Sequence, residues 1–125
     1  MKTLLFVDDE KTVLRLLVEY FSSRGYDTDT AHDGMSALAR VREGGLGTVF
    51  LDLKMPGMDG VETLRLIREI DADLPVIIVT GHATEELARR LLKDGAFDYV
   101  SKPVRLDRLG EIVKQLELIE EARTG

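Results

Sequence analysis

The chain of 125 residues has 17 basic and 23 acidic side chains, a formal net charge of −6, and a hydrophobic content of 44% that is enough for one packed core. No segment concentrates the Lys and Arg that a phosphate backbone requires, so the composition argues against direct nucleic-acid binding. Cysteine is absent, which excludes disulfides, thiolate nucleophiles and thiolate zinc sites.

Apolar runs in the chain are short, the longest having four or five residues, and no signal-peptide core opens it. We therefore expect a cytoplasmic protein with no membrane segment. We also expect one domain over residues 1–125, with residues 119–125 forming either the start of a linker or an extension of the last helix.

Apolar runs alternate with helical periodicity five times, which is typical of βα units and a parallel sheet. We predict strands over residues 3–7, 27–31, 48–52, 76–80 and 97–101. The spacing of apolar residues predicts helices around 14–21, 35–41, 61–70, 87–92 and 106–123. Gly25 and Gly95 are expected to follow the ends of the first and fourth helices. The whole pattern predicts an α/β domain of (βα)5 architecture with right-handed crossovers.

Three segments depart from this regular pattern. The second strand is polar, which favours a place at a sheet edge. Residues 43–47 are glycine-rich, but they precede a strand and lack the ending of a phosphate-binding loop, so we interpret them as a flexible connector. The stripe from Leu109 to Ile119 in the last helix is first of all a core face; a dimer seam and the start of a signalling helix remain open.

Carboxylates follow two of the apolar strands. Asp8 and Asp9 come after the first strand, and Asp52 ends the third. Because the carboxyl ends of parallel strands meet at one edge of a sheet, we expect these three side chains to share a pocket. Carboxylates so close together raise one another's pKa, and a divalent cation would relieve this cost. Magnesium, which prefers oxygen ligands, or manganese is the expected cofactor.

The fourth and fifth strands bring Thr80 and Lys102 to the same edge. A metal, an ammonium group and a hydroxyl around one carboxylate are sufficient for phosphoryl transfer, which depends on positioning and charge stabilisation. Asp52 is the best candidate for the nucleophile, since a carboxylate can form an acyl phosphate without a general base. Asp8 and Asp9 would then hold the metal.

These residues resemble one known family, the receiver domains of two-component response regulators. The resemblance covers essentially the whole chain and rests on Asp8, Asp9, Asp52 within the segment DLKMPGMDG, Thr80 and the Lys102-Pro103 dipeptide. It implies a doubly wound, flavodoxin-like sheet of five parallel strands in the order 2-1-3-4-5. It also implies a signalling domain rather than an enzyme that turns over a small molecule.

The resemblance assigns a role to each of these residues. Asp52 would accept phosphate from the phosphohistidine of a histidine kinase or phosphotransfer protein, and Lys102 would neutralise the phosphoryl oxygens. Asp9, Asp52 and the backbone carbonyl of Lys54 would bind Mg²⁺, with Asp8 acting through water. The Lys102-Pro103 peptide bond is expected to be cis.

The family also implies a switch. Thr80 would move toward the phosphoryl group and Tyr99 would turn inward, changing the face formed by the fourth helix, the fifth strand and the fifth helix. That face would contact an output domain or partner and would support a homodimer. Lys54 and His82 border the path of the hydrolytic water in this family, so we expect them to modulate the phosphate lifetime. His32 and His82 are not expected to bind metal.

Two other functions remain open at this stage. One is a protein-binding module that uses the receiver scaffold without phosphorylation. The other is an aspartyl-phosphate phosphohydrolase, which usually has a second aspartate two residues after the nucleophile. Lys54 occupies that position here, which disfavours the phosphohydrolase.

Overall fold

A computed structural model describes residues 2–55, 57–81 and 84–124. Strands and helices alternate along these residues, in the order β1 (Thr3–Val7), α1 (Lys11–Ser22), β2 (Thr28–Ala31), α2 (Gly34–Glu43), β3 (Leu46–Leu51), α3 (Gly60–Ile70), β4 (Val76–Thr80), α4 (Glu85–Lys93), β5 (Asp98–Ser101) and α5 (Leu106–Thr124). The strands form one parallel sheet in the order β2-β1-β3-β4-β5. The predicted fold class, the strand order and the edge position of the second strand are confirmed.

The main error in the predicted strands concerns β3. This strand begins at Leu46, where the sequence predicted a connector over residues 43–47, and it ends at Leu51. Leu46 is buried and pairs with Thr3 of β1, so burial and sheet pairing extend the strand backward. The turn is confined to Gly44 and Gly45, which have φ angles of 81° and 79° that glycine adopts easily.

Four helices begin earlier than the apolar periodicity predicted: α1 by three residues, α4 by two, and α2 and α3 by one. At α2, α3 and α4 a polar N-cap residue accounts for the earlier start, whereas the N-cap residue of α1 makes no side-chain cap bond. The Asp33 carboxylate accepts a hydrogen bond from the backbone of Ser36 at the start of α2. At the start of α3 the Asp59 carboxylate accepts a bond from the backbone N–H of Glu62, and at the start of α4 the Thr84 hydroxyl accepts one from the backbone N–H of Leu87. Such caps satisfy backbone N–H groups that have no partner inside the helix.

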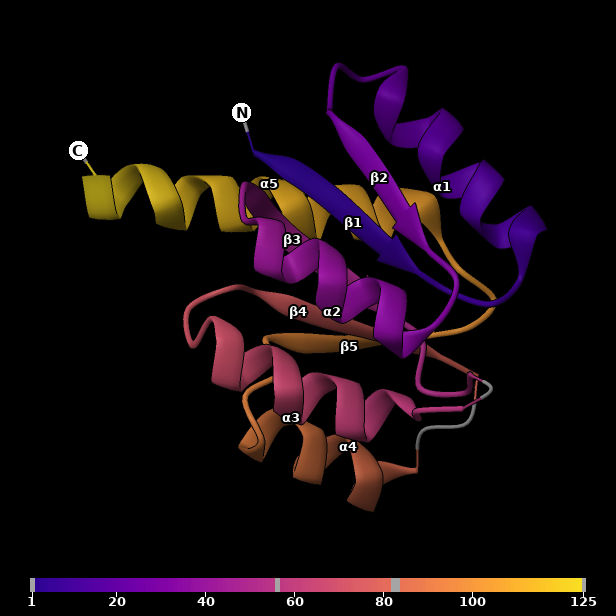
Figure 1. The fold of residues 1–125 in the computed structure, drawn as a ribbon. Helices are drawn as coiled ribbons and strands as arrows, with labels where there is room; N and C mark the ends of the chain where they lie inside the picture. The colour runs from indigo at the N-terminus through magenta and orange to yellow at the C-terminus, as the bar shows by residue number, and fades with distance from the viewer. Residues whose placement is uncertain (1, 56, 82–83, 125) are drawn as a thin grey trace.

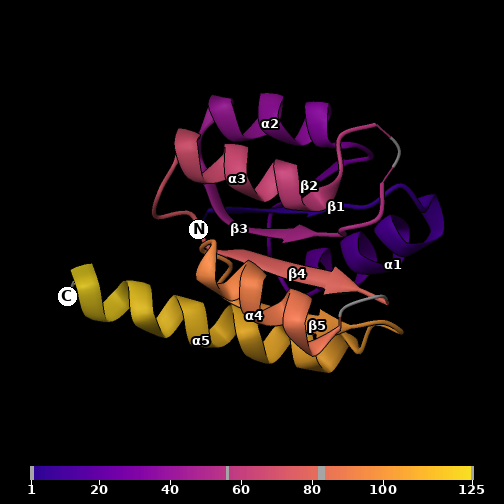
Figure 2. The same cartoon turned by 90° about the horizontal axis from the view of Figure 1, so that it is seen from below.

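Helices cover both faces of the sheet (Figures 1 and 2). On one face, α2, α3 and α4 bury apolar side chains against the strands, among them Leu38, Leu64, Ile67 and Leu91. On the other face, α1 and α5 cover a core that contains three aromatic rings, Phe6 of β1, Phe21 of α1 and Phe50 of β3, whose centroids lie 5.1 to 6.0 Å apart. α5 continues as a helix through Thr124, so residues 119–124 extend the last helix.

The two outer strands share a local feature. In β2, the Asp29 carboxylate accepts a hydrogen bond from the backbone N–H of Thr30 (2.9 Å) and pairs with Arg40 of α2. In β5, Asp98 accepts one from the N–H of Tyr99 (2.8 Å) and pairs with Arg108 of α5. Each edge therefore has a backbone donor that is satisfied by a side chain of its own strand.

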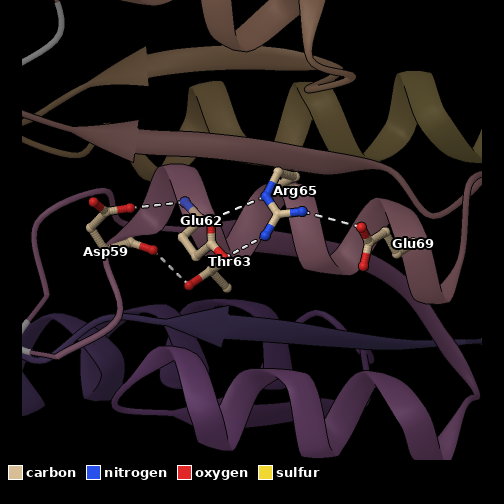
Figure 3. Close-up of polar contacts among 5 residues, drawn as sticks. All are labelled: Asp59, Glu62, Thr63, Arg65 and Glu69. Atoms are coloured by element: carbon tan, nitrogen blue, oxygen red, sulfur yellow. Dashed lines mark hydrogen bonds and ion pairs between the residues drawn. The ribbon is translucent and has the colours of Figure 1, made fainter.

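The loop that follows Asp52 is fixed where it enters α3. Figure 3 shows the cap: Asp59 accepts bonds from the backbone of Glu62 (2.8 Å) and from the Thr63 hydroxyl (2.8 Å). Arg65 bonds both Glu62 and Glu69 on the exposed face of the helix. The backbone of Gly60, the first residue of α3, packs directly against Leu53, to whose carbonyl its N–H donates (3.0 Å).

We predict that Gly60→Ala destabilises the fold by about 1–3 kcal/mol, because overpacking at a fixed backbone has costs of this order. The added methyl group would overlap the Leu53 backbone and lie 2.7 Å from the Asp52 carbonyl oxygen. Urea denaturation measures the effect. Gly110→Ala is the control: its methyl would meet only the movable Tyr20 side chain (3.3 Å), and alanine gains about 1 kcal/mol in helix propensity. Equal stability of Gly60→Ala and wild type would contradict the prediction.

Candidate functional site

Two neighbouring strands deliver the central carboxylates. Val7 and Leu51, the last residues of β1 and β3, are register partners, so Asp8 and Asp52 follow paired positions. The Asp52 N–H donates to the Val7 carbonyl (3.0 Å), which keeps the strand ends together. Asp8 and Asp52 are only 3% and 4% exposed. Buried acidic groups of this kind require partners.

Lys102 is the partner of both carboxylates. Its Nζ lies 3.0 Å from Oδ2 of Asp8 and 3.2 Å from Oδ2 of Asp52. Lys102 directly follows β5, and its backbone N–H donates to the Thr80 carbonyl at the end of β4 (3.0 Å). The structure thus brings Asp8, Asp52, Thr80 and Lys102 to one edge of the sheet.

The pKa values of Asp52 and Lys102 are both raised, but for different reasons. Burial raises the pKa of Asp52 and the neighbouring charge of Asp8 adds to the rise, while the backbone N–H of Lys54 and the Lys102 ammonium act against it. Burial alone would lower the pKa of Lys102, but its hydrogen bond to Asp8 and the charges of Asp52 and Asp8 bring that pKa above its ordinary value. The lysine is therefore charged at neutral pH, and its positive charge lies between the two carboxyl groups.

Asp9 is exposed and directly follows Asp8. The next residue, Glu10, was not among the predicted site residues. Carboxylate oxygens of Asp8, Asp9 and Glu10 all lie within 4.8 Å of one another. Glu10 also approaches Lys102, with 3.8 Å between Oε1 and Nζ. A donor set made only of oxygen atoms suits a hard divalent cation such as Mg²⁺. The available signal for Glu10 was its position directly after the paired acids.

The remaining predicted residues surround this centre. Thr80 is buried at the end of β4, opposite Ser101 of β5. Tyr99, on β5, is 37% exposed. The side chain of Lys54 is exposed, and its backbone N–H donates to Oδ1 of Asp52 (3.1 Å). The Lys102–Pro103 peptide bond is cis.

His82, which the sequence associated with the phosphate lifetime, lies outside the described residues. His32 is exposed, with Nδ1 3.6 Å from Asp33. A cavity of about 510 Å³ lies away from the site, at the opposite edge of the sheet near the starts of β1, β3 and β4, with lining residues that include Leu4, Leu46, Leu74 and Leu116. Its lining includes none of the predicted site residues.

Comparison with known proteins agrees with this geometry. Residues 4–114 match the response regulator receiver domain family. Over 112 residues the chain is 40% identical to the regulatory protein AtoC of Escherichia coli, covering 90% of this chain and 24% of AtoC. It is 36% identical to the sporulation initiation phosphotransferase F of Bacillus subtilis, covering 90% of each. A CheY-like receiver domain protein from Methanospirillum hungatei has a solved structure with a TM-score of 0.91 and 30% identity, covering 100% of this chain and 99% of that one.

The chain belongs to the response regulator receiver domain family, whose members are signalling domains of two-component systems. It spans about a quarter of the length of AtoC and of the C4-dicarboxylate transport regulator DctD of Rhizobium meliloti. Among the described residues, no helix has both the length and the apolar character needed to cross a membrane.

We predict that Asp52→Asn stabilises the metal-free protein at pH 7 by about 0.5–2 kcal/mol, the range that single stabilising substitutions commonly give. Since folding raises the pKa of Asp52, the folded state holds its proton more tightly, and stability falls as pH rises through that pKa. The gain should shrink as pH falls toward the ordinary value of 3.8. Urea denaturation over this pH range tests it, with the exposed Asp27→Asn as control. Lower stability of Asp52→Asn at pH 7 would contradict the prediction.

Proposed function

We propose that this receiver domain is a phosphoacceptor and that Asp52 receives the phosphoryl group from the phosphohistidine of a histidine kinase or phosphotransfer protein. The observation that carries the proposal is the contact of Asp52 with the Lys102 ammonium on one oxygen and the Lys54 backbone N–H on the other. These donors hold the carboxylate in one orientation at the end of β3. The name of the Bacillus subtilis relative, a phosphotransferase, supports phosphoryl transfer.

The reaction forms one bond and breaks one. A carboxylate oxygen of Asp52 attacks phosphorus, and the P–N bond of the phosphohistidine breaks, with its electron pair leaving on the imidazole nitrogen. Charge develops on the phosphoryl oxygens in this step. The ammonium of Lys102 is already 3.2 Å from Asp52, so the positive charge is in place before the phosphoryl group arrives.

A divalent cation, Mg²⁺ or Mn²⁺, fits the donors at this edge. Asp9, Asp52 and the backbone carbonyl of Lys54 would hold it, with Asp8 acting through water. When bound, it would supply positive charge that offsets the acidic side chains and the phosphoryl oxygens. The carboxylate oxygens of Asp8, Asp9 and Glu10 within 4.8 Å of one another support this part of the proposal.

The output is a change of surface. Thr80 would turn toward the phosphoryl group and Tyr99 would turn inward, so that the face formed by α4, β5 and α5 changes shape. This is supported by the burial of Thr80 beside the site and by the exposure of Tyr99 on the neighbouring strand. We propose that this face contacts an output domain or partner, or a second copy of the chain, and that the protein works in the cytoplasm as one domain over residues 1–125.

The first test is intact mass after incubation with Mg²⁺ and acetyl phosphate. Wild type should gain one phosphoryl group, and removal of the metal beforehand should prevent it. Asp52→Asn should gain none, because the nucleophilic oxygen is replaced by an amide. Wild type that gains no phosphoryl group under any metal condition would favour the protein-binding module. Steady turnover of a small phosphate ester would favour the phosphohydrolase instead.

We further predict that Lys54→Ala shortens the lifetime of the phosphorylated form by roughly threefold to tenfold, an effect of about 1 kcal/mol on the barrier. The Lys54 side chain is exposed and starts from a backbone that is bonded to Asp52, so it can cover the acyl phosphate and exclude water. The decay of phosphorylated protein, followed by mass, measures this. Lys114→Ala, an exposed lysine of α5, should decay like wild type. Equal decay of all three proteins would reject the role of Lys54.

A further inference from the structure

Glu10 stands at the start of α1 without acting as a helix cap. It is the N-cap residue, with φ −90° and ψ 108°, yet its side chain makes no cap hydrogen bond. The N-cap residues of α2, α3 and α4 all make such a bond. Glutamate is not among the side chains that favour this position. The N-cap position of α1 therefore departs from the usual residue preference. Departures of this kind are expected at functional sites, and this one lies beside the carboxylate site.

The Glu10 side chain instead approaches Lys102 and the carboxylates of Asp8 and Asp9. Its backbone N–H donates to Oδ1 of Asp8 (2.9 Å), which fixes the residue at the rim. Its carboxylate approaches Lys102, with 3.8 Å between Oε1 and Nζ, and is part of the acidic group with Asp8 and Asp9. The side chain is 64% exposed, so water weakens its interactions but leaves it free to respond to charges that enter the site.

The charges around Lys102 explain what a further carboxylate would do. Asp8, Asp9 and Asp52 supply three negative charges against one ammonium group, and Glu10 adds a fourth. An additional negative charge attracts a divalent cation and repels an anionic phosphodonor. Glu10 also competes with incoming phosphoryl oxygens for Lys102. The same carboxylate therefore acts in opposite directions on the two species that the site must accept.

We propose that Glu10 sets the balance between metal affinity and phosphodonor acceptance, strengthening the binding of Mg²⁺ while slowing phosphorylation by anionic donors. This rests on the proposed phosphoacceptor function. Glu10 contributes through its charge alone, and the nucleophile and the metal donors named above remain the same.

The test compares Glu10→Gln with Glu19→Gln, an exposed glutamate of the same helix nine residues further on, roughly 13 Å along the axis. Both variants change the net charge equally. Titration calorimetry measures Mg²⁺ affinity of the unphosphorylated protein, and intact mass measures the phosphorylation rate with acetyl phosphate at saturating Mg²⁺. Glu10→Gln should bind Mg²⁺ about threefold to tenfold more weakly and react several times faster, whereas Glu19→Gln should match wild type.

Opposite changes in the two quantities separate this role from a structural one. If both fall together in Glu10→Gln, or if either matches Glu19→Gln, the proposal is overturned. Glu10→Lys should lower the Mg²⁺ affinity and raise the phosphorylation rate by more than Glu10→Gln does. Urea denaturation checks that each variant is folded. Failure of the proposed function is a different result, since it is seen in wild type as the absence of any phosphoryl gain.

Discussion

The contact of one lysine with two buried carboxylates is the interaction on which this site depends. Asp8 and Asp52 come from adjacent strands and are almost fully buried, an arrangement that like charges alone would not tolerate. The Lys102 ammonium, 3.0 and 3.2 Å away, offsets part of this repulsion. The sheet makes this contact possible. Asp8, Asp52 and Lys102 are far apart in the sequence, but each follows a strand that ends at the same edge of the sheet.

Backbone contacts connect Lys102 and Asp52 to the segments beside them. The Lys102 N–H bonds the Thr80 carbonyl, and Thr80 pairs with Ser101, so the residue that neutralises Asp52 is tied to the ends of both β4 and β5. On the other side, Gly60 packs against the backbone of Leu53, which holds the segment after Asp52 close to α3. Backbone contacts therefore hold the segments on both sides of Asp52, and the side chains of Thr80 and Tyr99 are where we propose that movement occurs.

The sequence predicted the fold well because hydrophobic patterning determines it. Continuous apolar runs such as residues 76–79 indicated the buried strands, and the polar second strand indicated an edge. The boundary of β3 was wrong because Leu46 joins the strand through burial and pairing with Thr3, which local composition does not reveal. The predicted starts of α2, α3 and α4 were late because the caps at Asp33, Asp59 and Thr84 are polar. The start of α1 was late because its first turn holds no buried apolar residue before Leu14.

Prediction of the site had a similar limit. Placing Asp8 and Asp52 together followed from strand topology, and Lys102 followed from its position after the last strand. Glu10 was missed because an acidic residue before a helix is adequately explained by the helix dipole. Only the three-dimensional contact with Lys102, and the missing cap bond, distinguish it from an ordinary first-turn acid.

The aspartates of the two edge strands have a consequence for how this domain associates. A free N–H at a sheet edge can recruit a strand from another molecule, which leads to aggregation. Asp29 and Asp98 occupy such donors at Thr30 and Tyr99 and place a carboxylate beside each. A sixth strand is thereby discouraged at either end of the sheet. A partner that approaches β5 at Tyr99 would accordingly meet the Asp98 carboxylate rather than a free main-chain donor.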